Sequence, residues 1–324
     1  MPAYSCAWRN QAAKYCILIK MRRAIAPLIL LLFVLAGCEK EMDLANRLPE
    51  SNLELTDGYC LVAGDQVVVN HRDISYYDYG AHLLYLKSHR SSAEFLEEAG
   101  SLTVYAGGKE IYTVNTHPGY SSYMPWGPFI WTFPNFYEDY IIAIDLMATL
   151  TGFMEEGSDS REDPRIVKAL KKYGQYREGL HCEIVSCNYS TPGEVRLSLK
   201  LSNRDDVNYY YLDPEKMGMG LFHYFTNGLS LRDAEERQSY TNHTEHISPV
   251  PWDSWDLEWM SLLEGGSSVT ITLEYKNFET VPAGTYTAWF RFPGLVHVEH
   301  DQLAQRHGQI WLGKLELNNE VVVQ

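Results

Sequence analysis

The chain has 324 residues, with 27 lysines and arginines against 42 aspartates and glutamates, and a formal net charge of −15. This acidic balance argues against binding to nucleic acid or to anionic lipid headgroups, both of which attract basic surfaces. The length is sufficient for two domains with a sizeable core.

The N-terminal region carries the pattern of an export signal. Arg22-Arg23 precedes an apolar run over residues 24–36, which is too short to span a bilayer comfortably but typical of a signal peptide. The run ends in Leu35-Ala36-Gly37-Cys38, and residues 21–38 resemble the signal peptide and lipobox of bacterial lipoproteins. The resemblance implies cleavage before Cys38 and acylation of that residue, by diacylglyceryl and palmitate-type chains. Several acyl chains at one residue anchor a protein without a transmembrane helix.

The residues on either side of this signal complete the predicted leader. Met21 is a natural initiator, so residues 1–20 are interpreted as a start-site artefact and residues 21–37 as the signal peptide. Residues 38–53 are polar and predict a lipidated tether. Glu39 follows the lipidated residue where inner-membrane lipoproteins of enterobacteria tend to have aspartate, which favours the outer membrane. Cleavage would remove five basic residues and no acidic one, leaving a net charge of −20.

Residues 54–179 predict a first domain with α+β structure. Ser91 and Glu94 have the spacing of a capping box, so we expect a helix over Ser91–Ala99 that ends at Gly100. A β-hairpin is expected where two apolar runs flank the turn sequence Ala106-Gly107-Gly108-Lys109. The expected strands are Gln66–Asn70, Asp73–Tyr79, Leu83–Lys87, Leu102–Tyr105, Glu110–Val114 and, buried, Tyr140–Leu146.

A second helix is expected to begin at Asp163-Pro164. Asp163 can cap the helix, and Pro164 suits its first position. Apolar residues then recur at helical spacing as far as Tyr173, and Gly174 ends the pattern. The charged, glycine-containing residues 155–162 predict a loop before it.

The segment Tyr120–Tyr140 holds nine aromatic residues in 21. Prolines within and beside it disfavour a regular helix or a central strand, so we expect an irregular aromatic loop. The more common role of such rings is to cover a sheet or to fill the seam between domains. The alternative is a recognition surface, because Trp and Tyr combine a large apolar area with a polar group. Its candidate ligand-binding residues are Tyr120, Tyr123, Trp126 and Trp131.

Residues 180–324 predict a second domain that is mainly β. In Glu194–Leu201 apolar and polar residues alternate, which is the pattern of a half-buried strand. This run, with Pro282-Ala283-Gly284-Thr285-Tyr286 entering a later strand, resembles the immunoglobulin-like domains of bacterial envelope proteins. The resemblance implies a β-sandwich, although the Cys…Trp…Cys signature is absent. The other expected strands are Leu180–Tyr189, Asn208–Leu212, Leu221–Phe225, Ser268–Tyr275, Gly284–Phe292 and Gly308–Leu317.

The fold class that follows is mainly β with a minor α component: an N-terminal α+β domain followed by an immunoglobulin-like β-sandwich. Within the second domain, Trp252, Trp255 and Trp259 have helical spacing with Leu262-Leu263. We expect them to form one apolar stripe on a short helix that begins near Ser254, and to pack into the core.

The sequence lacks a recognisable catalytic or metal-binding motif. His243-Thr244-Glu245-His246 and His297-Val298-Glu299-His300-Asp301 have the residue types of a metal site but not the spacing of a zinc-protease helix. The serine-hydrolase elbow, the phosphate-binding loop and the dinucleotide fingerprint are all absent. The sequence therefore predicts no catalytic residue, no metal site, no cofactor and no enzymatic activity.

Beyond Cys38, three cysteines follow the signal peptide: Cys60, Cys182 and Cys187. If Leu180–Tyr189 is one regular strand, Cys182 and Cys187 lie on opposite faces and about 16 Å apart, too far to form a disulfide. Two alternatives stay open: Cys60 forms a disulfide with one of these residues, or all three are free thiols.

The expected function is that of a lipid-anchored bacterial cell-envelope protein, located most naturally at the outer membrane, that acts as a non-enzymatic binding or scaffold module. One alternative is a glycan-binding lipoprotein that uses the aromatic loop 120–140. Another is an inhibitor or immunity protein against a secreted hydrolase. The expected partners are the lipid bilayer, through acylated Cys38, and an envelope protein or a glycan; nucleic acid is not among them.

Overall fold

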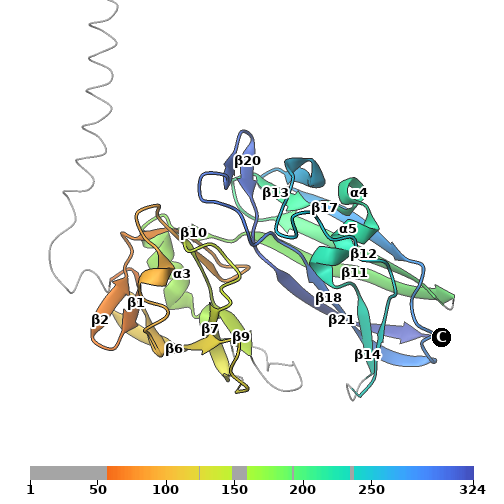
Figure 1. Cartoon of the computed structure of the whole chain (residues 1–324), viewed down its shortest axis with the longest axis horizontal. Coiled ribbons are helices and arrows are strands. Elements are labelled where there is room, and N and C mark those ends of the chain that lie inside the picture. Colours follow the sequence, from red (N-terminus) through yellow and green to blue (C-terminus); the bar gives the residue numbers. More distant parts are fainter. Residues whose placement is uncertain (1–56, 124, 148–158, 192, 234–236) are drawn as a thin grey trace, which may run out of the picture. The chain divides into compact units, whose positions relative to one another are not determined.

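The computed structural model describes residues 57–123, 125–147, 159–191, 193–233 and 237–324, and from Leu55 to Gln324 the chain forms one compact unit. The protein is mainly β, as expected, with a few short helices (Figure 1). None of the helices in the described ranges combines the length and apolarity needed to cross a membrane. The lipobox, Cys38 and the predicted tether lie outside the described residues. The domain boundary near Gly179 stays a prediction.

The first sheet has six strands in the order β2-β1-β5-β6-β7-β9. The predicted hairpin is confirmed: β5 and β6 pair antiparallel, and Gly107 and Gly108 take φ values of 60° and 74° in its turn. Positive φ is strained for residues with a Cβ, which explains the two glycines. The strands are β1 (Tyr59–Ala63), β2 (Gln66–Val69), β5 (Ser101–Ala106), β6 (Lys109–Pro118), β7 (Gly127–Phe133) and β9 (Asp145–Met147).

A second sheet, ordered β10-β3-β4-β8, shares a hydrophobic cluster with the first and with the helix α3 (Pro164–Lys172). The predicted start of this helix is confirmed, because the Asp163 side chain accepts a hydrogen bond from the backbone N–H of Arg165 at 2.8 Å. A short 3₁₀ turn, η2 (Ser160–Glu162), precedes it. The strands are β3 (Ile74–Asp78), β4 (Leu83–Leu86), β8 (Ile141–Ala143) and β10 (Tyr176–Arg177).

The helix predicted over Ser91–Ala99 is wrong. Only a 3₁₀ turn forms there, η1 (Ser92–Glu94), and Ser91 makes no capping hydrogen bond. Both members of the expected capping box bind elsewhere: the Ser91 hydroxyl donates to Asp139 at 3.2 Å, and Glu94 accepts from Arg90 at 2.6 Å. A capping box stabilises a helix only when its two side chains turn back on the helix terminus.

The remaining strands form three sheets, ordered β11-β12-β17, β16-β13-β20-β19 and β15-β14-β18-β21, which contribute to a second hydrophobic cluster. The alternation predicted in Glu194–Leu201 is confirmed, since Val195, Leu197, Leu199 and Leu201 are all buried. The strands are β11 (Leu180–Thr191), β12 (Glu194–Asn203), β13 (Tyr209–Leu212), β14 (Ser230–Asp233), β15 (Ser239–Thr241), β16 (Met260–Leu263), β17 (Ser268–Tyr275), β18 (Gly284–Phe292), β19 (Ala304–Gln305), β20 (Gly308–Ile310) and β21 (Leu315–Val323).

The prediction that Cys182 and Cys187 lie on opposite faces of their strand is wrong. The pairing of β11 with β12 shifts register between Ile184 and Ser186, so Val185 is the extra residue of a β-bulge and is exposed. Cys182 lies opposite Leu201 and Cys187 opposite Leu197, which face the core together. An extra residue reverses the facing of everything beyond it. No two of Cys60, Cys182 and Cys187 form a disulfide with each other.

The strand predicted over Leu221–Phe225 is instead part of a helix. Helix α4 (Pro214–Met217) and helix α5 (Met219–Thr226) follow one another, and Asp213 caps the first by accepting from the Glu215 backbone N–H at 2.9 Å. Short apolar runs do not distinguish helix from strand by periodicity. The signal for the helix was Asp213-Pro214, the same pair that begins α3.

The helix predicted from Ser254 is also wrong. One 3₁₀ turn, η3 (Leu257–Trp259), leads directly into β16, which pairs antiparallel with β13. Leu263 is buried and Trp255 and Trp259 are half-buried against the core, but Trp252 is 63% exposed. Sheet pairing has overridden the helical spacing here. In the same way, the single strand expected over Gly308–Leu317 is divided into β20 and β21 by residues 311–314.

Candidate functional site

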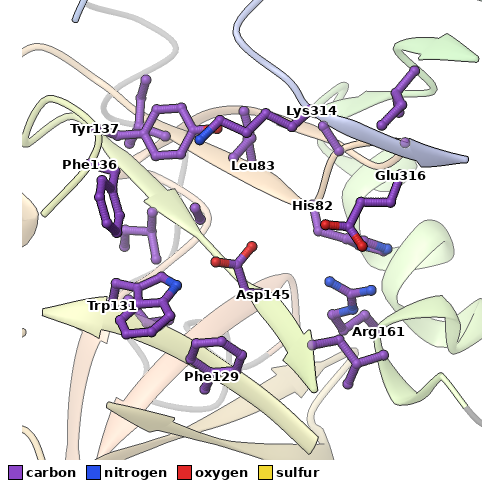
Figure 2. A pocket seen from close by; sticks show the side chains of 18 of the residues that line it. His82, Leu83, Phe129, Trp131, Phe136, Tyr137, Asp145, Arg161, Lys314 and Glu316 are labelled. Atoms are coloured by element: carbon purple, nitrogen blue, oxygen red, sulfur yellow. The ribbon is translucent and has the colours of Figure 1, made fainter. Parts of the chain in front are cut away.

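A cleft of about 800 Å³ is lined by residues from both ends of the described chain. One side comes from β7, from β8 and β9 and from the turn at residues 80–82. The other comes from residues 314–317 at the start of β21. Figure 2 shows aromatic rings along one part of the cleft, with charged side chains directed into the space beside them. Its aromatic lining is Phe129, Trp131, Phe136 and Tyr137, and its charged lining is Asp145, Asp159, Arg161, Glu162, Arg291, Lys314 and Glu316.

The aromatic part of the cleft is built on β7. Phe129 is buried and Trp131 is half-buried, and their ring centroids lie 5.2 Å apart in an edge-to-face arrangement. Phe136 packs edge-to-face on Trp131 at 6.1 Å and is 44% exposed. The row of rings therefore runs from the protein core out to solvent, which leaves ring surface available to a ligand.

Asp145 supplies a carboxylate beside these rings. It lies opposite Phe129 in the antiparallel pairing of β9 with β7, and its carboxylate accepts a hydrogen bond from the Trp131 side chain. The side chain is open to solvent within the cleft. Crowding by the surrounding walls disfavours its charged form and raises the pKa of Asp145, although Lys314 and Arg161 partly oppose the shift.

A second acidic group lies at Asp159. Its carboxylate binds the Arg161 guanidinium at 2.7 Å, and Arg161 also donates to the Ile144 carbonyl oxygen at 2.7 Å. Burial opposes ionisation of Asp159, but the bonds from Arg161 outweigh it and lower the pKa of that carboxyl. Arg161 is thus a fixed, paired cation on the wall of the cleft.

His82 completes this corner of the cleft. Its Nδ1 lies 3.0 Å from the Tyr77 hydroxyl, and its Nε2 lies 4.0 Å from Asp159. Burial and the nearby Arg161 charge lower the pKa of His82, so the ring is neutral. Potential metal-ligating atoms of His82, Asp159 and Glu162 lie within 4.8 Å of one another. They do not fit a metal ion, because the Arg161 guanidinium already binds the Asp159 oxygen that a cation would need.

Lys314 is placed by a short segment with strong tertiary contacts. The Trp311 indole N–H donates to Asp78 Oδ2 at 3.0 Å, and the Tyr137 hydroxyl donates to the Leu312 carbonyl oxygen at 3.2 Å. Gly313 lies so close to Ala81 that a Cβ on it would be 2.5 Å from the alanine Cβ. These contacts hold residues 311–314 against the turn at residues 80–82 and direct Lys314 to the cleft.

The Lys314 ammonium lies over two aromatic rings, 5.3 Å from the centroid of Tyr137 and 5.9 Å from that of Phe136. Figure 2 shows its side chain extended along the Tyr137 ring. The crowded surroundings, together with the Arg291 charge, lower the pKa of Lys314, while Asp145 opposes this shift. Arg291 itself is paired with Glu316.

The candidate residues chosen from sequence divide into two sets. Trp131 lines the cleft, whereas Tyr120, Tyr123 and Trp126 are 80%, 65% and 54% exposed and are not part of its lining. The prediction of an irregular aromatic loop is wrong for its central part. There β7 pairs parallel with β6, and Pro128 is accommodated as the second residue of β7.

Several lining residues were missed by the sequence reasoning. Phe136 and Tyr137 belonged to the aromatic segment but were not selected within it. Asp145, Arg161 and Lys314 carry no local signal, since isolated charged residues are common on any surface.

The two histidine groups considered from sequence do not converge on a metal-binding geometry in the described chain. His243 is exposed and lies 3.6 Å from Glu279, while the His246 ring packs on His223 at 4.3 Å. His297 lies 3.5 Å from Glu138, and His300 packs on Tyr140.

No model of a known protein family matches this chain, and a search of curated proteins finds none that is significantly similar. Half-exposed rings can stack on the apolar face of a flat ligand, and the carboxylates and cations can bind its polar substituents.

Proposed function

We propose that this protein is a lipid-anchored cell-envelope protein that binds a glycan in the cleft between β7 and the start of β21. The observation that supports a glycan ligand is that one cleft of about 800 Å³ contains both partly exposed aromatic rings and a carboxylate that is hydrogen-bonded to one of those rings. Sugar rings present an apolar face for stacking and hydroxyl groups that donate to carboxylates, so both halves of the cleft have a counterpart.

The proposed location depends on the sequence before the described residues. The lipobox Leu35-Ala36-Gly37-Cys38 supports acylation of Cys38, and Glu39 supports the outer membrane. Replacement of Cys38 by Ser should move the protein from the membrane fraction to the soluble fraction of the envelope. Membrane retention of that variant would contradict lipid anchoring.

The proposal is for binding and not for catalysis, because the sequence carries no catalytic motif.

The proposal also includes an immunoglobulin-like arrangement for the strands after Gly179. Two antiparallel sheets support this assignment, β11-β12-β17 and β15-β14-β18-β21. Leu197 and Leu199 of the first and Ala288 and Phe290 of the second lie in one hydrophobic cluster, as the facing sheets of a sandwich would.

The glycan proposal is tested with the full chain purified in detergent. Neutral oligosaccharides of glucose and of N-acetylglucosamine are titrated while tryptophan fluorescence and heat release are recorded. We expect saturable binding, and a loss of at least ten-fold in affinity for Trp131→Ala. Trp252→Ala is the matched control, since Trp252 is exposed but does not line the cleft. Equal affinity of the two variants, or no binding across the panel, would contradict the proposal.

The exposed rings outside the cleft favour a second candidate function, docking of an envelope protein. Tyr120 and Phe133 are 80% and 63% exposed and lie in contact, with centroids 6.1 Å apart. Clusters of exposed aromatic residues are typical of protein interfaces. Photo-crosslinking from position 120 in intact cells should then give one discrete adduct that disappears in a Phe133→Ser variant.

A further inference from the structure

The cleft holds two opposite charges that do not bind each other. Asp145 comes from β9, and Lys314 comes from the segment that precedes β21. In the described part of the chain, neither takes part in an ion pair within 4.0 Å, whereas Arg161 pairs with Asp159 and Arg291 pairs with Glu316. Among the lining residues, the Lys314 ammonium therefore has no partner of opposite charge within that distance, and neither do the carboxylates of Asp145 and Glu162, of which Glu162 lies in the corner with His82 and Asp159.

Each of these charges is accompanied by an aromatic ring. Asp145 is bonded to the Trp131 side chain, and Lys314 lies over Tyr137 and Phe136. In Figure 2 the Asp145 carboxylate is directed into the space above Trp131, and the Lys314 chain extends beside Tyr137. Both polar groups are also open to solvent, so a ligand in the cleft can reach them.

The surroundings make both charges costly within the cleft. The pKa of Asp145 is raised and that of Lys314 is lowered, and in each case crowding by the walls is the largest cause. Each group is therefore shifted towards its neutral form, as expected where the walls displace part of the water around an ion and no oppositely charged group of the described chain lies within 4.0 Å to replace it. A ligand that carries both a positive and a negative group would compensate both.

A ligand with a single charge would form a favourable ion pair with only one of the two residues, Asp145 or Lys314. An anionic sugar would gain at Lys314 but would be repelled by Asp145 and Glu316, and a cationic sugar would gain at Asp145 but meet Lys314, Arg161 and Arg291. Charge complementarity of this kind determines specificity more than total affinity.

We propose that the cleft selects a zwitterionic sugar, with an ammonium group bound at Asp145, a carboxylate bound at Lys314 and the sugar ring stacked on Trp131 and Phe136. This inference rests on the proposed glycan-binding function and names the class of sugar. Asp145 and Lys314 act as specificity-determining residues that contact the ligand directly.

The test uses four related sugars that differ in N-acetylation and in a 3-O-lactyl group, and therefore in these two charges. N-acetylglucosamine is neutral, glucosamine carries the amine, N-acetylmuramic acid carries the carboxylate, and muramic acid carries both. Dissociation constants are measured by NMR titration of the full chain. We expect muramic acid to bind at least ten-fold more tightly than N-acetylglucosamine, with the two singly charged sugars no better than the neutral one.

Two variants test which residue of the cleft binds each charged group of the sugar. In Lys314→Met, muramic acid should no longer bind more tightly than glucosamine, which lacks the carboxylate. In Asp145→Asn, which retains a hydrogen-bond acceptor for Trp131, muramic acid should no longer bind more tightly than N-acetylmuramic acid. Lys87→Met and Asp301→Asn are the matched controls, because both residues are exposed and outside the cleft. Thermal unfolding confirms that each variant is folded.

The outcomes separate this inference from the function on which it rests. Equal affinity for the four sugars, or a preference for one charge alone, overturns the zwitterionic ligand; binding of neutral oligosaccharides would then still support a glycan site. Failure of every sugar to bind, the neutral oligosaccharides included, overturns both. A muramic acid preference that survives both cleft variants would place the selectivity elsewhere and also overturns the inference.

Discussion

The indole N–H of Trp311 donates a hydrogen bond to Asp78 Oδ2 at 3.0 Å, between two residues that are both buried. Asp78 also accepts from the Ala81 backbone N–H at 3.1 Å, so one carboxyl group holds the turn at residues 80–82 and the segment that carries Lys314. Both of these line the cleft. The geometry of the candidate site therefore depends on a contact between residues 233 positions apart.

Replacement of Trp311 by Phe should destabilise the protein by about 1.5–3 kcal/mol, because a buried carboxyl group loses its donor while most of the ring packing is retained. Burial raises the pKa of Asp78 to about 7. The carboxyl is thus increasingly ionised above that pH, and the loss should be larger at pH 8 than at pH 5. Urea unfolding at the two pH values measures this. Trp126→Phe, at an exposed site, should change the free energy of unfolding by less than about 0.5 kcal/mol.

Gly179 should not tolerate a side chain. Its φ is 76°, and a Cβ would lie 2.2 Å from Asp78 Oδ1, inside contact distance of the same carboxyl group. Gly179→Ala should therefore cost more than the roughly 1 kcal/mol expected from backbone strain alone. Gly266→Ala is the matched control, since its φ is 71° and no atom lies within 4 Å of the new Cβ. Comparable losses in thermal unfolding for the two variants would show that Gly179 is required only for its backbone conformation.

His82 should make the protein sensitive to mild acid. Its pKa is lowered in the folded state, mainly by burial and then by Arg161, whereas an unfolded histidine titrates near 6.5. As the pH falls below about 6.5, the unfolded state takes up a proton at this position that the folded state does not, so the contribution of His82 to stability decreases, whereas the raised pKa of Asp78 acts in the opposite direction.

A variant at this position separates the titration from the fold. Asn suits the φ of 51° at His82 and does not titrate, so in His82→Asn the unfolding free energy should fall less, or rise more, than in the natural chain as the pH decreases from about 6.5 to 5. His89→Asn, at an exposed histidine, should leave the slope unchanged. An equally steep slope in the His82 variant would assign the acid sensitivity to other groups.

The three thiols at Cys60, Cys182 and Cys187 should be unreactive in the folded protein. Burial raises the pKa of each to about 12, so the thiolate, which is the reactive form, is scarce at pH 8. Alkylation with iodoacetamide followed by peptide mass mapping should modify these positions only in denaturant. Rapid modification of Cys187 alone in the native protein would show that the β11 strand opens locally.

The elements predicted correctly are those whose signals are local. The hairpin after Leu102 follows from two adjacent glycines, the helix after Asp163 from a cap and a proline, and the strand Glu194–Leu201 from strict alternation. In each case the backbone preference and the direction of burial agree within ten residues. The failed predictions, such as the helices from Ser91 and Ser254, had a local pattern that a tertiary contact outweighed.

By itself, the sequence determined the mainly β class, the acidic charge, the lipobox pattern at Cys38 and the aromatic content of Tyr120–Tyr140. Only the tertiary structure decided that Trp131 lines a cleft while Trp126 does not, that Cys182 and Cys187 share a face, and that Asp145 and Lys314 occupy the same space. The physical reason is that a single β-bulge at Val185 and one hydrogen bond between Trp311 and Asp78 change which residues meet. Neither has a signature within its own segment, because each depends on partners that are distant in the chain.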